Sequence, residues 1–116
     1  MRPRAKFIQA ALPFVGQGLL NPKSLGKSAA YSVPSDQRAQ LVYFRGGSSL
    51  ADLVCVSLLR DGALLRLFPI GAKSTVHIPL AVIEDLEPGS VLEVQLAAPT
   101  GAEGVIFLDI GLVEVD

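Results

Sequence analysis

The side chains most able to do chemistry are scarce in this sequence, which contains one histidine, His77, and one cysteine, Cys55. A nucleophilic site needs a serine or cysteine within reach of a base that a third group orients. The alternation of residues 75–80 places His77 on the face away from Val76 and Ile78, so we expect an exposed or interface histidine rather than a base. Cys55 lies mid-strand between two valines, where a free thiol usually packs as a small buried hydrophobe. We therefore predict no catalytic residue, and a protein that is not an enzyme.

Metal and cofactor sites have little support either. One histidine and one cysteine cannot supply the three or four ligands of a zinc site. Glu84, Asp85 and Glu87 fall in one predicted loop, but calcium needs six to eight oxygen ligands and no EF-hand spacing is present. The Gly-Gly-Ser-Ser run at residues 46–49 is not followed by the lysine of a phosphate-binding loop. The sequence predicts no metal and no cofactor, and a solvated acidic loop.

A few basic side chains define one candidate ligand site. Arg45, Lys73 and His77 are the candidate anion-binding residues, and Arg66 is expected near them. A cavity that opened beside them would take a small anion. Titration with candidate anions would test this hypothesis.

Composition limits the classes of partner. The chain has 116 residues, of which 50% are hydrophobic and 18% charged, enough for one domain with a real core. Residues 1–28 hold five basic residues and no acid (+5), whereas the remainder holds five basic and eleven acidic residues (−6). An acidic body and a pI near 5.7 oppose a nucleic-acid binder. With no tryptophan and two tyrosines, the sequence also does not favour a sugar-binding sandwich.

Location follows from the apolar runs and the cysteine count. The longest apolar runs are far shorter than the roughly 20 residues that cross a bilayer. Polar and proline residues interrupt the N-terminal stretch where a signal peptide needs a continuous apolar run. A lone cysteine cannot form an intramolecular disulfide. We therefore predict no membrane span and a cytoplasmic protein.

The first 30 residues are predicted to form a basic, extended N-terminal arm. Three prolines and three glycines leave room for no helix longer than one or two turns. The apolar residues of the arm have too many proline and glycine neighbours to make a core of their own. We therefore expect the arm to dock on a sandwich surface, and we favour docking across a subunit boundary. Residues 31–116 form the second predicted unit. The breaking residues are Pro3, Pro13, Gly16, Gly18, Pro22 and Gly26.

From residue 38 onwards the pattern indicates six short strands. The pair Asp61-Gly62 between two apolar runs is a strong signal for a two-residue hairpin turn. No long helix interrupts the series, so the fold class is all-β: an antiparallel β-sandwich of jelly-roll or immunoglobulin-like type. The predicted strands are residues 38–45, 53–60, 63–70, 75–80, 91–97 and 105–115.

The predicted hairpin has apolar residues on both faces. A two-residue turn pairs Leu59 with Leu64 and Val56 with Leu67, which makes one face the core. The other face is apolar apart from one polar pair, Ser57 and Arg66. We therefore expect another segment or another protein to shield it from water. Its apolar residues are Leu53, Cys55, Leu59, Leu64, Phe68 and Ile70.

These patterns favour a non-catalytic assembly or accessory subunit. In this hypothesis the sandwich forms a homo-oligomer, or docks on a larger protein complex, through its arm and its second apolar face. The alternative is a ligand-binding sandwich for a small anion. The predicted partner-interface residues are Phe7, Ile8, Leu12, Phe14, Leu53, Leu59, Leu64, Arg66 and Phe68.

Overall fold

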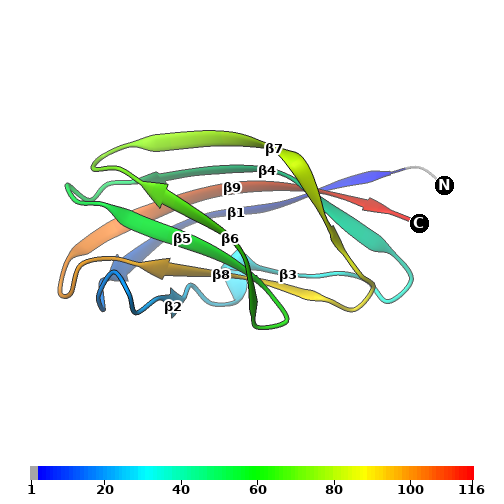
Figure 1. The fold of residues 1–116 in the computed structure, drawn as a ribbon, viewed down its shortest axis with the longest axis horizontal. Coiled ribbons are helices and arrows are strands. Elements are labelled where there is room, and N and C mark those ends of the chain that lie inside the picture. Colours follow the sequence, from blue (N-terminus) through cyan, green and yellow to red (C-terminus); the bar gives the residue numbers. More distant parts are fainter. Residues whose placement is uncertain (1–2) are drawn as a thin grey trace.

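The computed structural model describes residues 3–116, apart from the side chains of residues 82 and 83, and forms a two-layered β-sandwich (Figure 1). A single short 3₁₀ turn, η1 (Lys27–Ala29), lies among the described residues, and none of their helices is long and apolar enough to cross a membrane. The strands are β1 (Arg4–Val15), β2 (Lys23–Ser24), β3 (Ala30–Ser32), β4 (Arg38–Ser48), β5 (Val54–Arg60), β6 (Ala63–Ile70), β7 (Thr75–Leu86), β8 (Val91–Ala97) and β9 (Glu103–Val115).

The strand order is that of a jelly roll. Sheet A has the order β1-β9-β4-β7, and sheet B has the order β2-β8-β5-β6, with β3 also pairing with β8. All pairs are antiparallel. The chain passes back and forth between the two sheets, which is the double Greek-key arrangement of a jelly roll. The predicted all-β sandwich is therefore confirmed, with the jelly roll as its topology.

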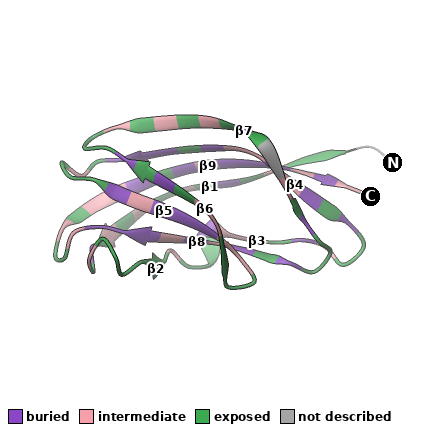
Figure 2. Cartoon of the chain, viewed as in Figure 1, coloured by how far each residue is buried: buried purple, intermediate pink, exposed green. Residues whose placement is uncertain are grey.

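The core lies between the sheets, where buried residues follow β9, β4, β5 and β8 (Figure 2). In β8, Leu92, Val94 and Leu96 are buried while Glu93 and Gln95 point outward, as the two-residue period requires. The largest fully buried side chains include Phe44, Leu41, Leu58, Ile70, Leu86, Leu92, Ile106, Ile110 and Leu112.

The β5–β6 hairpin has the predicted turn but not the predicted register. Asp61 and Gly62 both have positive φ, 49° and 84°, as a type I′ turn requires. A bulge beside Leu58 and Leu59 then shifts the pairing by one residue, so that Val56 faces Phe68 rather than Leu67. Beyond the bulge the predicted faces of β6 are therefore exchanged: Phe68 and Ile70 are buried, and Leu67 is exposed.

The N-terminal segment is extended but lies within the sandwich. Over its whole length β1 pairs with β9, and β2 and β3 pair with β8. Ile8 is buried and Leu12 and Phe14 pack against the core, so β1 completes sheet A of its own chain. We favoured docking on another subunit, whereas β1 docks on β9 of its own chain. The two-residue period was present in the sequence, but Pro13 obscured it.

Strand β7 is longer than predicted. The strand continues through residues 81–86, which the sequence suggested to be a loop or a helical turn. Its pairing with β4 is irregular there, because Tyr43 faces Pro79 whereas Leu41 faces Glu84. The two acidic residues Glu84 and Asp85 therefore lie in a strand rather than in a loop.

Candidate functional site

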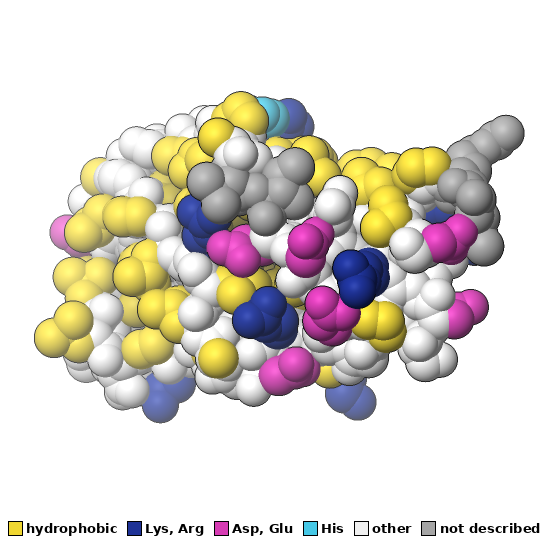
Figure 3. Space-filling model, turned by 45° about the vertical axis from the view of Figure 1, so that its right-hand side comes forward, with side chains coloured by type: hydrophobic (Ala, Val, Ile, Leu, Met, Phe, Trp, Pro, Cys, Tyr) yellow, Lys and Arg dark blue, Asp and Glu magenta, His cyan; other side chains and the backbone are white. Residues whose placement is uncertain are grey.

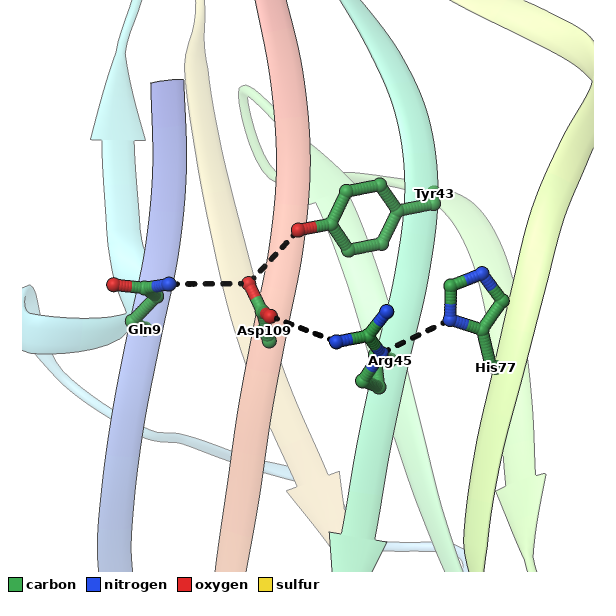
Figure 4. A network of polar contacts seen from close by, with 5 residues as sticks. All are labelled: Gln9, Tyr43, Arg45, His77 and Asp109. Carbon is green, nitrogen blue, oxygen red and sulfur yellow. Dashed lines mark hydrogen bonds and ion pairs between the residues drawn. The ribbon is translucent and has the colours of Figure 1, made fainter. Parts of the chain in front are cut away.

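A row of polar side chains crosses all four strands of sheet A on its outer face (Figure 4). The pairing register places Gln9 of β1 beside Asp109 of β9, Asp109 beside Arg45 of β4, and Arg45 beside His77 of β7. Tyr43 precedes Arg45 by two residues and therefore points to the same face. We call these five residues the outer-face network.

Asp109 is the centre of the outer-face network. Its carboxylate accepts hydrogen bonds from the Tyr43 hydroxyl at 2.9 Å, from a terminal nitrogen of Arg45 at 3.3 Å and from the Gln9 amide at 3.5 Å. The Arg45 side chain is 52% exposed, and an ion pair so open to water contributes only about 0–1 kcal/mol to stability. The main effect of these contacts is to orient the side chains toward one another.

His77 enters the network through its ring nitrogen Nδ1. The Nε–H of Arg45 donates to this nitrogen over 2.9 Å. Arginine has no acceptor, so Nδ1 of His77 is the acceptor in this contact. The His77 ring also stacks on Tyr43, with centroids 5.6 Å apart and planes 10° from parallel. Within the outer-face network, Arg45 and Asp109 form an ion pair of opposite charges.

Tyr43 lies against the backbone of Gly111. A Cβ at residue 111 would overlap the Tyr43 ring, so glycine lets the ring lie over the neighbouring strand. The register of β4 against β9 shifts beside Gly111, between Leu41 and Tyr43 of β4. Partial burial, together with the hydrogen bond to Asp109, raises the pKa of Tyr43, so the phenol remains a hydrogen-bond donor.

An open hollow of about 330 Å³ adjoins the outer-face network. Gln9 and Asp109 form part of its wall, and Phe107 and Gly47, which are paired neighbours, form the rest of the outer surface there. Gly47 has no side chain to cover the Phe107 ring, which remains half-exposed. Polar groups and an aromatic face therefore meet in one depression of the surface.

Only part of the predicted anion site is assembled. Arg45 and His77 are in contact, but Lys73 lies in the turn before β7, where its backbone N–H donates to the Leu50 carbonyl. Arg66 pairs with Glu84 of β7 over 3.2 Å. Sequence reasoning missed Gln9, Tyr43 and Asp109, although Asp109 alternates with buried neighbours and could have been placed on an outer face.

The predicted interface residues divide into three groups. Ile8 and Phe68 belong to the core of the domain, so the prediction that they lie on an exposed interface is wrong. Leu12 and Phe14 pack against this core. Leu59 and Arg66 are half-buried. Exposed members are Phe7, Leu53 and Leu64.

The acidic residues of the β7 region do not converge. Glu84 pairs with Arg66, Asp85 accepts a hydrogen bond from Gln40 at 3.0 Å, and Glu87 lies 3.6 Å from Arg38. Within the described part of the chain, no three histidine, cysteine or acidic side chains are placed to hold a metal ion.

Comparison with known proteins identifies the fold. No protein-family model matches the sequence, and no curated protein matches it. The CBM36-1 domain of a multidomain xylanase from the hindgut metagenome of Trinervitermes trinervoides is similar over 95% of this chain and 96% of that chain, with a TM-score of 0.58 and 14% identity. The insecticidal delta-endotoxin Cry8Ea1 from Bacillus thuringiensis matches 91% of this chain with 20% of its own, at a TM-score of 0.53 and 11% identity. A protein of infectious bursal disease virus, Gx strain, matches 97% of this chain with 32% of its own, at a TM-score of 0.55 and 12% identity.

Proposed function

We propose that this chain is a non-catalytic ligand-binding module, and that the outer face of sheet A binds an uncharged, hydroxyl-rich ligand of the carbohydrate class. The observation that carries the proposal is the position of Asp109, which gathers three hydrogen-bond donors beside an open hollow. Ligand sites typically combine a hollow with a few convergent polar groups, and here the hollow is shallow and open.

The chemistry of the outer-face network suits hydroxyl groups. A hydroxyl both donates and accepts, so it can bond to the Asp109 carboxylate and to a guanidinium N–H of Arg45 together. The guanidinium carries five N–H donors, and the outer-face network uses Nε and one terminal nitrogen. The exposed Phe107 ring offers an apolar surface for the C–H face of a sugar ring.

A neutral ligand fits this site better than the anion that the sequence suggested. Asp109 already pairs with Arg45 and would repel a second negative charge beside it. The small number of aromatic residues argued against sugar binding, but two of them, Tyr43 and Phe107, lie at this site. The fold likeness to a CBM36 domain, a carbohydrate-binding module, is compatible with this ligand class, while the residues of the outer-face network carry the argument.

A matched pair of variants tests the proposal. Neutral oligosaccharides would be titrated into the protein and followed by calorimetry and by amide chemical shifts. Asp109→Ala should abolish saturable binding, because it removes the acceptor that orients Tyr43, Arg45 and Gln9. Asp85→Ala is the control, since Asp85 accepts a single hydrogen bond from Gln40 on the same sheet. Absence of saturable binding to a broad panel of neutral sugars, or equal losses in both variants, would contradict the proposal.

The same variants separate the anion hypothesis. If the site took a small anion, Asp109→Asn would release Arg45 and strengthen the binding of phosphate or a carboxylate. If the site takes a neutral ligand, this variant should weaken sugar binding and the native chain should show no saturable anion binding.

Assembly is a second candidate function, favoured by the outer face of sheet B. Leu64 and Leu67 are each 56% exposed and Leu53 is 47% exposed, and large exposed apolar patches often mark protein contacts. In Figure 3 hydrophobic side chains cover the left of the view and parts of its top, and charged ones lie near the middle. Leu64→Glu should abolish capture of a partner on this face without lowering the stability of the free domain.

A further inference from the structure

Strand β1 presents a free hydrogen-bonding edge at one side of sheet A. In a strand, successive backbone N–H and C=O groups point to opposite sides. The N–H of Gly16 donates to Ala102 on the β9 side, so the even-numbered residues of β1 face β9. Ala5, Phe7, Gln9 and Ala11 therefore direct their N–H and C=O groups away from the sheet. Pro13 is also odd-numbered, so its nitrogen points away from β9. The β1–β9 ladder therefore loses no hydrogen bond at this proline.

The other sheet edges carry features that oppose pairing with another strand. β7 contains Pro79 and is irregularly paired near its middle, and β6 contains Pro69. β2 is two residues long and β3 is three. Natural sandwiches use prolines, short strands and irregularities to block such edges. In β1, Pro13 blocks one end, which leaves Ala5 to Ala11 as an open edge.

We propose that this edge pairs with β1 of a second copy of this chain, antiparallel and with the two-fold axis at Ile8. In this register Phe7 of each copy faces Gln9 of the other, and Ala5 faces Ala11. Each such pair exchanges both backbone hydrogen bonds. The two four-stranded sheets then form one continuous sheet of eight strands.

Three features of the sequence favour a second copy and this register. Pairing centred on Gln9 instead would place Ala5 opposite Pro13, which cannot donate, whereas the Ile8 register leaves Pro13 outside the shared ladder. Lys6, the inward-pointing charge that would discourage most partners, faces the small Ala10 of the second copy rather than another base. Within the shared ladder of residues 5–11 the one charged residue is Lys6, and residues 7–11 carry no charge.

Side chains add apolar contact to the hydrogen bonds. Phe7 points to the outer face and is 54% exposed, and it would pack against the second copy beside Gln9. On the inner face Ile8, which is already buried in its own core, lies at the axis, and the half-buried Leu12 faces Arg4 of the second copy. Because the axis is perpendicular to the sheet, both outer faces point to the same side. The dimer does not depend on the ligand proposed above.

Mass and amide exchange together test the dimer in the full chain. Sedimentation should give a dimer that dissociates on dilution. In the dimer, the amides of Phe7, Gln9 and Ala11 should exchange slowly, and dilution should make them exchange rapidly, because in the monomer they face water. A chain that stays monomeric at the concentrations used for spectroscopy, with these amides exchanging rapidly, would overturn the proposal.

Variants locate the interface. Phe7→Lys places two like charges on the outer face, diagonally across the axis from each other, and Ala11→Pro removes an outward N–H that the β1–β9 ladder does not use. Both should yield folded monomers, as checked by far-ultraviolet circular dichroism. Phe107→Lys is the control, because Phe107 is 52% exposed on the same face but lies on β9. A dimer that survives both β1 variants, or is lost equally in Phe107→Lys, would show that the copies meet elsewhere.

Discussion

At the scale of single residues, Gly111 and Tyr43 are fitted to each other. The ring occupies the space of the missing side chain and directs its hydroxyl to Asp109. Gly111→Ala should force the ring away, at a cost of about 1–3 kcal/mol in the free energy of unfolding, as overpacking usually does. Denaturant unfolding measures this. In Tyr43→Ala the same glycine substitution should cost much less, and equal costs in both backgrounds would contradict the fit.

Cys55 is the second residue whose behaviour follows from its surroundings. Burial raises the pKa of this thiol, so at a given pH less of it is thiolate than in an unfolded chain. Alkylation near pH 8 should therefore be slower in the native protein than in urea, and the native rate should keep rising as the pH increases beyond the pKa of a free thiol. Equal rates in the native and unfolded states would show that the outer face of β5 gives the sulfur no shelter.

Single residues also show why the site was only partly predictable. The period of two placed His77 on an outer face, and the same reasoning applied to Leu108 and Ile110 would have placed Asp109 there. The contacts themselves were not predictable, because Gln9 and Asp109 are 100 residues apart in sequence. Such pairs depend on strand order and register, which local patterns do not encode.

At the scale of elements, the turn of the β5–β6 hairpin was predictable from the sequence, whereas its strand register was not. Asp61-Gly62 predicts the turn because few residue pairs adopt positive φ at both positions. The bulge beside Leu58 follows from packing: it brings Phe68 inside, parallel to Phe44 with ring centroids 4.0 Å apart. No local signal identifies such a bulge.

The two possible registers make opposite predictions for neighbouring residues. Phe68→Ala should lower the free energy of unfolding by about 3–5 kcal/mol, because it leaves a cavity in the core. Leu67→Ala should change it by no more than about 0.5 kcal/mol, because Leu67 is exposed. Urea unfolding of both variants decides between the registers. A large loss of unfolding free energy in Leu67→Ala, with a small loss in Phe68→Ala, would indicate the unbulged pairing.

Strand β1 is the element that sequence reasoning placed least well. Its inward residues Ile8, Ala10, Leu12 and Phe14 alternate regularly, but the charge and the prolines of the segment favoured an arm. Pro13 is tolerated because it lies on the outermost strand with its nitrogen away from β9. A proline in an edge strand thus resembles, in sequence, a proline in a loop.

At the scale of the whole molecule, the sandwich class was predictable because many short alternating segments with glycine and proline turns leave few other architectures. The β1 dimer would join two outer faces into one surface. Strands lie about 4.8 Å apart, so the two β9 strands, separated by both copies of β1, would be about 14 Å apart. Gln9 of each outer-face network would lie at the junction.

This arrangement predicts avidity for a polymeric ligand, given both proposals. A chain of sugar units that reaches the second network binds it as an intramolecular event, which can strengthen binding by about 10²–10⁴-fold without a new contact. A short oligosaccharide should bind the native protein and Phe7→Lys equally well, because Phe7 lies outside the outer-face network. A long neutral polysaccharide should bind the native dimer far more tightly than the monomeric variant. Measuring both ligands against both proteins separates the sugar-site proposal from the dimer proposal. Phe107→Lys is not used here, because Phe107 borders the hollow. Equal affinities for the polysaccharide, with the dimer confirmed by mass, would show that the two networks cannot be engaged together.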